Sequence, residues 1–183
     1  METNGPLVEK ALVLALKAHE GQTRKEASTP YIVHPVRVAI LLARYGFDDV
    51  IVAAGLVHDV VEDTSVSLED VRRELGEEVA ALVAPVTHDE SLPWEERKKA
   101  YIESVHAASE GAKAVSVADK IANAESLLAA HAREGSAVWR HFNAGKEKKL
   151  WFEESMLTML QESWQHPLVG AYAQAVQEMK ALD

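Results

Sequence analysis

The residues best suited to chemistry lie in one short run, GLVHDVVEDT, which holds His58, Asp59, Glu62 and Asp63. In a helix, residues four apart share a face, so His58 aligns with Glu62, and Asp59 aligns with Asp63. His58 and Asp59 are separated by about 100° around a helix axis and can converge on one ion between them. Imidazole and carboxylate ligands suit Mn²⁺, Fe²⁺ or Zn²⁺ better than Ca²⁺. The run indicates a metal site, with a polar helix end and an exposed Glu62–Asp63 pair as the competing interpretation.

Two ligands are too few for such a metal, so others must come from elsewhere in the fold. His34 is one candidate, because it stands beside Pro35 where a helix is expected to begin. Asp119 is a second, because it lies in the Ala-rich run KAVSVADKIANAESL, where a lone carboxylate is costly without a partner. A simple ion pair of Asp119 with Lys120 or with a neighbouring basic group is the competing interpretation. Four other histidines have surface-type neighbours, and we expect them to face solvent: His106, His131, His141 and His166.

Basic and amide side chains accompany these acids at two places. Arg24 and Lys25 fall in the polar loop of residues 20–30, and Lys120 and Asn123 lie in the Ala-rich run. Arginine grips a phosphate through two N–H groups, and lysine supplies a point charge. Taken singly, each is better explained as an ordinary surface residue. Together they indicate a locally basic pocket for an anionic substrate.

Helical periodicity runs through most of the chain and predicts an all-α fold. Pro35 suits a first helical position, and Ser67 with Asp70 predicts a capping box. Strict alternation and Gly-rich hairpin signals are missing, so no strand is expected. We expect one domain over residues 1–183, with a second polar loop over residues 132–146. The expected helices cover residues 7–18, 36–43, 50–61, 67–76, 93–108, 113–130 and 147–162, and a last helix follows Pro167.

Composition narrows the class of protein. The chain has 183 residues, of which 48% are hydrophobic, enough for one domain with a core. Its net charge of −10 disfavours a general DNA or RNA binder but allows a small anionic ligand in a basic pocket. The absence of cysteine excludes disulfides and thiolate nucleophiles. There is no apolar run of about 18 residues and no export signal at the N-terminus, so we expect a cytoplasmic protein without a membrane span.

Four runs carry a resemblance to a known family: AHEGQTRKEASTPYIVHPVRVA, AAGLVHDVVEDTSVSLEDVRRELGEEVAALVAPVTHDESLP, ERKKAYIESVHAASEGAKAV and VADKIANAESL. They occur in family order and spacing over roughly residues 8–130. The chain resembles the HD-domain hydrolases of the RelA/SpoT type, and most closely the stand-alone small alarmone hydrolases. The combination RK…PYIVHP…HDVVEDT…ADKIAN is highly specific, whereas an isolated His-Asp pair is a weak signal. The resemblance implies an all-helical HD-domain bundle, which the helices of residues 147–183 complete.

The resemblance also implies an activity, the removal of the 3′-pyrophosphate from (p)ppGpp, typically with Mn²⁺. The implied metal ligands are His34, His58, Asp59 and Asp119. Glu62 and Asp63 match the pair that positions and activates the attacking water. The implied nucleotide contacts are Arg24, Lys25, Asn123 and, less closely matched, Ser126. The chemistry is consistent with the residues, because a metal lowers the pKa of its water to about 7 and a carboxylate can take the proton.

Some positions depart from the family pattern. Many relatives have lysine at the position of His88 and lysine or arginine at that of Ser116, and a tyrosine that contacts the base is loosely matched by Trp151. The metal and water residues are intact, so the altered part is the base pocket. Three hypotheses follow: a (p)ppGpp hydrolase, an HD phosphohydrolase acting on another phosphorylated nucleotide, and a nucleotide-binding module without catalysis. The complete acid and histidine set speaks against the third. The helix after Pro167 can pack on the core or form a contact between subunits of a homo-oligomer.

Overall fold

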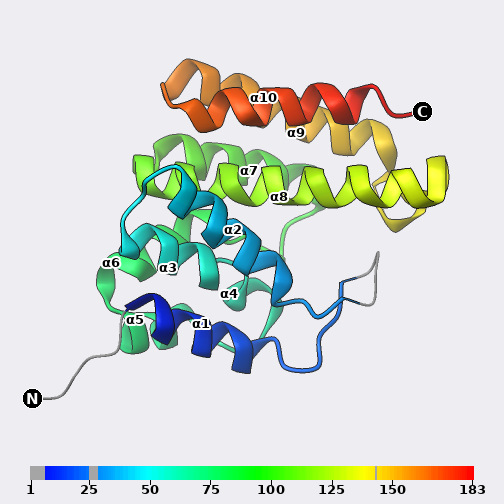
Figure 1. The fold of residues 1–183 in the computed structure, drawn as a ribbon. Helices are drawn as coiled ribbons and strands as arrows, with labels where there is room; N and C mark the ends of the chain where they lie inside the picture. Colours follow the sequence, from blue (N-terminus) through cyan, green and yellow to red (C-terminus); the bar gives the residue numbers. More distant parts are fainter. Residues whose placement is uncertain (1–6, 25–28, 143) are drawn as a thin grey trace, which may run out of the picture.

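The computed structural model describes residues 7–24, 29–142 and 144–183, and these residues form an all-α fold. The elements are α1 (Leu7–Ala18), α2 (Val33–Arg44), α3 (Asp49–Val57), α4 (Val60–Asp63), α5 (Leu68–Leu75), α6 (Glu77–Val83), η1 (Ala84–Val86), α7 (Trp94–Ala107), α8 (Glu110–Glu134), η2 (Gly135–His141), α9 (Gly145–Ser163) and α10 (Pro167–Lys180). Figure 1 shows α8 lying between a layer of N-terminal helices and the α9–α10 pair. The described residues form no strand, only an isolated bridge between Thr23 and Pro30. The expected fold class is confirmed.

Helix α8 is the longest element, and its position explains its unusual composition. The side chain of Ser109 caps its start by accepting from the backbone N–H of Ala112 at 3.3 Å. Neighbouring helices cover α8 on both sides, so small alanine side chains let them approach closely. Even Asp119 and Lys120 are more than nine-tenths buried. The helix therefore places charged groups in the interior, where they need partners.

The expected helix over residues 50–61 is wrong in one respect, because the structure divides it. Helix α3 ends at Val57, and α4 resumes at Val60. The ring of His58 bonds the carbonyl of Gly55 at 2.8 Å, and that carbonyl would otherwise accept from the amide of Asp59 in a continuing helix. The interruption falls at His58 and Asp59 and aims both side chains toward α8.

Helices α2 and α3 approach closely at Gly55. A Cβ atom at this position would lie 2.5 Å from Cδ1 of Leu42 and 3.3 Å from Cγ1 of Val38. The missing side chain therefore permits the close contact that brings His34 of α2 beside His58, with ring centroids 5.3 Å apart. Glycine here serves the approach of two helices that both carry histidines of the candidate site.

Other boundaries differ from expectation in small ways. Helix α2 begins at Val33, so Pro35 is its third residue rather than its first, still within the turn whose N–H groups have no helical partner. The capping box is confirmed, since Ser67 accepts from the amide of Asp70 at 3.1 Å and Asp70 accepts from that of Ser67 at 3.0 Å. Helix α6 was not expected, and η2 occupies half of the second polar loop. Among the described residues, no helix is long and apolar enough to cross a membrane.

Candidate metal centre

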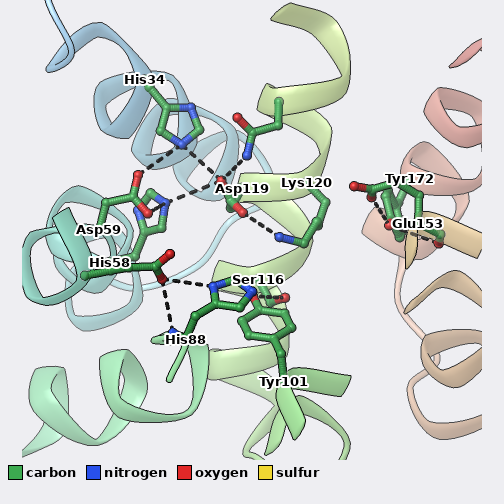
Figure 2. A network of polar contacts seen from close by, with 12 residues as sticks. His34, His58, Asp59, His88, Tyr101, Ser116, Asp119, Lys120, Glu153 and Tyr172 are labelled. Carbon is green, nitrogen blue, oxygen red and sulfur yellow. Dashed lines mark hydrogen bonds and ion pairs between the residues drawn. The ribbon is translucent and has the colours of Figure 1, made fainter. Parts of the chain in front are cut away.

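Two imidazoles and two carboxylates meet where the interrupted α3–α4 segment faces α2 and α8 (Figure 2). Nε2 of His34 lies 3.0 Å from Oδ1 of Asp119 and 3.5 Å from Oδ2 of Asp59. Nε2 of His58 lies 3.0 Å from Oδ1 of Asp59 and 3.5 Å from Oδ1 of Asp119. The ligand atoms of His34, His58 and Asp59 all lie within 4.8 Å of one another. The structure thus brings together the four residues expected to hold a metal.

The hydrogen bonds of His58 leave one ring nitrogen for a cation. Its Nδ1–H donates to the carbonyl of Gly55, which fixes the tautomer with a lone pair on Nε2. That Nε2 is buried and has no hydrogen-bond partner among the described residues, although the carboxylate of Asp59 lies beside it. A divalent ion would give this nitrogen a partner and offset the charge of both carboxylates. The residues present therefore fit a divalent metal, and the ligand types suit Mn²⁺, Fe²⁺ or Zn²⁺.

The buried charges also demand a cation at this point. Burial alone would lower the pKa of His58, but Asp59 and Asp119 raise that pKa well above its usual range. Burial would raise the pKa of Asp119, yet Lys120 and the two imidazoles hold it well below its usual range. Burial would raise the pKa of Asp59 too, yet His58 lowers it below its usual range. Both carboxylates are therefore ionised, and the site attracts either a proton on His58 or a metal in its place.

The contacts of Asp119 fit both interpretations of its sequence position, an ion pair and a metal ligand. Its Oδ2 accepts from Nζ of Lys120 at 2.9 Å, which is the simple ion pair. Its Oδ1 accepts from Nδ2 of Asn123 at 2.6 Å and also faces the two imidazoles. The ion pair fixes the orientation of the carboxylate without taking the oxygen that faces the histidines.

Glu62 and Asp63 have different environments, although they are adjacent. Glu62 accepts from the backbone N–H of His88 at 3.1 Å and lies 2.9 Å from Nδ1 of the same residue. Burial opposes ionisation of Glu62, but these contacts with His88 outweigh it and lower the pKa of the carboxyl. Burial and the nearby Asp59 and Glu62 carboxylates raise the pKa of Asp63, against the hydrogen bond that it accepts from Tyr31. At neutral pH, Glu62 is therefore the more firmly ionised of the pair.

Tyr31 connects Asp59 of the candidate metal centre with Asp63, and it was not identified from the sequence. Its hydroxyl lies 2.6 Å from Oδ2 of Asp63 and 2.8 Å from Oδ2 of Asp59. Burial and the Asp59 carboxylate raise its pKa, so it remains a donor with one proton to share between two acceptors. Its ring also stacks on that of buried His19, with centroids 4.5 Å apart. The run PYIVHP contained Tyr31, but its contacts depend on tertiary packing.

A cavity of about 360 Å³ opens from the metal centre and has a basic wall. Arg24 and Asn123 line it, as expected for nucleotide contacts, and Nη2 of Arg24 donates to Oδ1 of Asn123 at 3.0 Å. Ser126 is not among these lining residues and instead borders a smaller hollow that Arg24 and Arg37 also line, so its nucleotide contact stays a prediction. Lys25 lies outside the described residues. The lining also includes basic and aromatic residues that were not expected: Trp94, Arg97, Lys98, His141, Phe142, Lys149 and Phe152.

Lys98 of that wall has a strongly lowered pKa. Burial lowers its pKa to about 7, and the nearby Lys120 and Lys149 ammonium groups act in the same direction. The basic run ERKKAYIE was visible in the sequence, but only the fold turns Lys98 toward the site. Trp151 is 38% exposed, and its ring lies beside that of Trp94. Trp94 and Phe152 line the cavity, whereas Trp151 does not. Phe152 rather than Trp151 therefore faces the cavity, and the aromatic contact with a base stays a prediction.

The histidines expected to face solvent divide into two groups. His106 is exposed, as expected. The other three are partly buried, so the expectation holds for them only in part. His131 lies 2.7 Å from a carboxylate oxygen of Asp183, His141 lies 2.9 Å from Glu134 and lines the cavity, and His166 stacks on Trp164.

Comparison with known proteins places this site in a family. The profile of the HD domain matches residues 11–148, and the chain belongs to the HD-domain family. Among curated relatives, guanosine-3′,5′-bis(diphosphate) 3′-pyrophosphohydrolase MESH1 of Xenopus tropicalis is 38% identical over 130 residues, covering 69% of this chain and 73% of the relative. The Homo sapiens protein of the same name is 43% identical over 121 residues, covering 64% and 68%. The RelA/SpoT-type resemblance is confirmed.

Two solved structures share the fold. A metazoan ortholog of SpoT, described as hydrolysing ppGpp, aligns over 100% of both chains with a TM-score of 0.80 and 28% sequence identity. The protein lmo0812 of Listeria monocytogenes aligns with a TM-score of 0.74 and 36% identity, covering 82% of this chain and 97% of its own. The N-terminal and C-terminal helices therefore belong to the same fold as the central site.

Proposed function

We propose that this chain is a divalent-metal hydrolase that removes the 3′-pyrophosphate from (p)ppGpp. The observation that carries the proposal is the convergence of His34, His58, Asp59 and Asp119 at the edge of a cavity with a basic wall. Within the described residues, Nε2 of His58 has no hydrogen-bond partner there. The activity named for the MESH1 relatives and for the metazoan SpoT ortholog supports the choice of substrate.

The four converging residues are the proposed metal ligands, and Mn²⁺ is the proposed ion, with Fe²⁺ or Zn²⁺ compatible with the same donors. When bound, the ion supplies an acidified water and a counter-charge for a phosphoryl oxygen. Lys120 and Asn123 hold the Asp119 carboxylate in place. His58 is held by the carbonyl of Gly55, so its Nε2 remains directed at the ion.

Glu62 is the proposed general base, with Asp63 in support. The lowered pKa of Glu62 keeps it ionised and able to take a proton from the attacking water, a role that contributes about 10²- to 10⁴-fold in rate. Asp63 is held by the Tyr31 hydroxyl and has a raised pKa, so it suits the orientation of water better than removal of its proton. The two adjacent acids therefore have different proposed roles, because their environments shift their pKa values in opposite directions.

The cations around the cavity are the proposed contacts for the nucleotide phosphates. Arg24, Lys98 and Lys149 line the cavity, and guanidinium and ammonium groups pair with phosphate oxygens. They supply the local positive charge that the acidic chain lacks as a whole. Lys25 remains a proposed contact from its sequence position.

A second candidate function is hydrolysis of another phosphorylated nucleotide. The observation that favours it is the altered cavity wall, where Phe152 rather than Trp151 faces the cavity and Ser116 bonds Tyr101 at 2.9 Å. Neither change touches the four proposed ligands. The reaction type would be retained while the recognised base or phosphate differs.

The test is an assay of the Mn²⁺-reconstituted chain with ppGpp, pppGpp and a panel of 3′- and 2′-phosphorylated nucleotides. GDP and pyrophosphate from ppGpp are the expected products. Orthophosphate from another nucleotide, with ppGpp intact, would replace the first function with the second. Binding of ppGpp without turnover by any nucleotide would leave a binding module. In the same assay, Glu62→Gln should lose most of the activity, and the matched control Glu69→Gln, on an exposed face of α5, should keep it.

A further inference from the structure

His88 lies between the proposed base and a cation of the cavity wall. Its Nδ1 lies 2.9 Å from Oε2 of Glu62, and its Nε2 lies 2.8 Å from Nζ of Lys98. The three side chains come from three separate segments, α4, the residues after η1, and α7. Both Glu62 and Lys98 line the cavity, as does His88 itself. The imidazole thus touches the acid with one nitrogen and the cation with the other.

The partners of His88 determine which nitrogen carries its proton. A carboxylate can only accept, so Nδ1 donates to Glu62, and an ammonium can only donate, so Nε2 accepts from Lys98. Burial, together with the charges of Lys98 and Lys120, lowers the pKa of His88 despite the opposing effect of Glu62. A neutral ring with its proton on Nδ1 satisfies both contacts at once.

Packing holds the ring in this orientation. The ring of Tyr101 stacks on that of His88, with centroids 4.2 Å apart and planes inclined by only 10° (Figure 2). The hydroxyl of Tyr101 is held in turn by Ser116 at 2.9 Å. Lys98 lies over the ring of Phe152, 4.6 Å from its centroid. The imidazole therefore has little freedom to release either partner.

We propose that His88 is a positioning residue that holds Glu62 through Nδ1 and holds Lys98 through Nε2, linking the base to the anion-binding wall. The proposal rests on the proposed hydrolase function. A lysine side chain at position 88 could donate to Glu62 but could not accept from Lys98. The histidine is thus what allows one residue to serve both sides.

Two substitutions separate the two contacts. His88→Asn places an amide N–H near the position of Nδ1, so it can keep the Glu62 contact and loses the Lys98 contact. His88→Gln places an amide oxygen near the position of Nε2, so it can keep the Lys98 contact and loses the side-chain donor to Glu62. The backbone N–H of residue 88 continues to donate to Glu62 in both variants. The pair is matched in polarity and differs in reach alone.

The expected kinetic effects are opposite in kind. His88→Gln should lower kcat about ten- to hundredfold with KM within about threefold of wild type, the usual range for losing a hydrogen bond to a charged group. His88→Asn should raise KM about tenfold and keep kcat within about threefold. If both variants showed the same fall in kcat and the same rise in KM, the proposal would be overturned. A merely structural role of His88 would not distinguish its two ring nitrogens.

A second measurement does not depend on activity. In the ¹⁵N-histidine-labelled full chain, with diamagnetic Zn²⁺ present, the His88 ring should show a protonated Nδ1 and an unprotonated Nε2 at pH 7, assigned by its loss in His88→Asn. Glu62→Gln should shift the Nδ1 signal, and Lys98→Met the Nε2 signal. The opposite tautomer would overturn the linkage even in an active enzyme. A wild type with this tautomer but no hydrolysis of any nucleotide would contradict the proposed function and leave the contact pattern of His88 established.

Discussion

Two buried clusters of polar side chains lie on either side of α8, each with at least one acid, and they differ in how their charge is balanced (Figure 2). In the first, Asp59 and Asp119 face His34 and His58, and Nε2 of His58 has no hydrogen-bond partner in the part of the chain that the structure describes. In the second, Glu153 of α9 is only 1% exposed. The Tyr172 hydroxyl donates to its Oε2 at 2.5 Å, and Lys149 pairs with its Oε1.

The difference shows what separates a binding site from a structural network. Glu153 has a cation and a hydroxyl of its own chain, so its charge is balanced without any ligand. Burial opposes its ionisation, yet Lys149 and Lys120 lower its pKa. The first cluster reaches balance only when a proton or a metal is added. Burial of acids alone would not have distinguished the two.

The largest expected effect comes from removing a ligand of the first cluster. Asp59→Ala should lose the metal and reduce hydrolysis at least about a thousandfold, since both the acidified water and the counter-charge disappear. Glu62→Ala should reduce hydrolysis about 10²- to 10⁴-fold while keeping the metal. Metal content by mass spectrometry and initial rates measure the two effects. Equal metal loss in both variants would show that Glu62 is a ligand rather than the base.

The second cluster should respond in stability instead. Glu153→Gln leaves Lys149 without its counter-charge and should lower the free energy of unfolding by about 2 kcal/mol, toward the low end for a buried pair because Lys149 is partly exposed. Metal content should not change. Because the folded pKa of Glu153 is lowered, its contribution to stability is complete above the ordinary value of 4.5 and is lost as pH falls through the folded value. Urea unfolding of the wild type and of Glu153→Gln at neutral and acidic pH checks this prediction. A drop in the metal content of Glu153→Gln would show that the two clusters are coupled.

Protons should compete with metal in the first cluster only. The carboxylates raise the pKa of His58, so the chain without metal holds a proton that the metal must displace. The dissociation constant for Mn²⁺ should rise about tenfold for each pH unit below that pKa. Titration calorimetry in buffers of different ionisation enthalpy counts the released protons. These two pH values, 8 and 6, lie on either side of the ordinary imidazole pKa of about 6.5. An affinity for Mn²⁺ that stays constant between them would contradict this competition.

The smallest expected effect concerns the cavity wall between the clusters. The pKa of Lys98 is lowered to about 7, chiefly by burial, so its ammonium is progressively lost above neutral pH. The KM for ppGpp should rise a few-fold from about pH 7 to about pH 8, because fewer chains present the cation. Lys98→Arg keeps its charge at every such pH, so its KM should show no comparable rise. A wild-type KM independent of pH would place Lys98 outside the anion contacts.

The sequence was informative where function depends on local spacing. The His58–Asp59 pair stood out because carboxylates and an imidazole interrupt an apolar run, and the helix of residues 7–18 was predicted at its observed bounds. The interruption between α3 and α4 was not predictable from periodicity, since it depends on the bond between the His58 ring and the Gly55 carbonyl. Asp119 became a proposed ligand only through family resemblance, because its distance to His34 depends on how α2 packs against α8.

The second cluster was missed altogether for a related reason. Glu153 and Tyr172 are 19 residues apart, and they meet only because α10 folds back along α9. The cavity wall likewise combines Tyr31, Lys98 and Phe152 from segments distant in the chain. Patterns within a single helix cannot predict such contacts, whereas ligands within one turn leave a visible signature.

Mn²⁺ binding to the full chain is the most direct test of the central claim, that the first cluster is a metal centre and the second is not. Calorimetry at neutral pH should give about one Mn²⁺ per chain for wild type and for Glu153→Gln, as expected for one cluster of four ligands. Asp119→Asn, which keeps the shape and removes the charge, should bind at least about tenfold more weakly. Wild-type affinity in Asp119→Asn, or loss of binding in Glu153→Gln, would contradict the account.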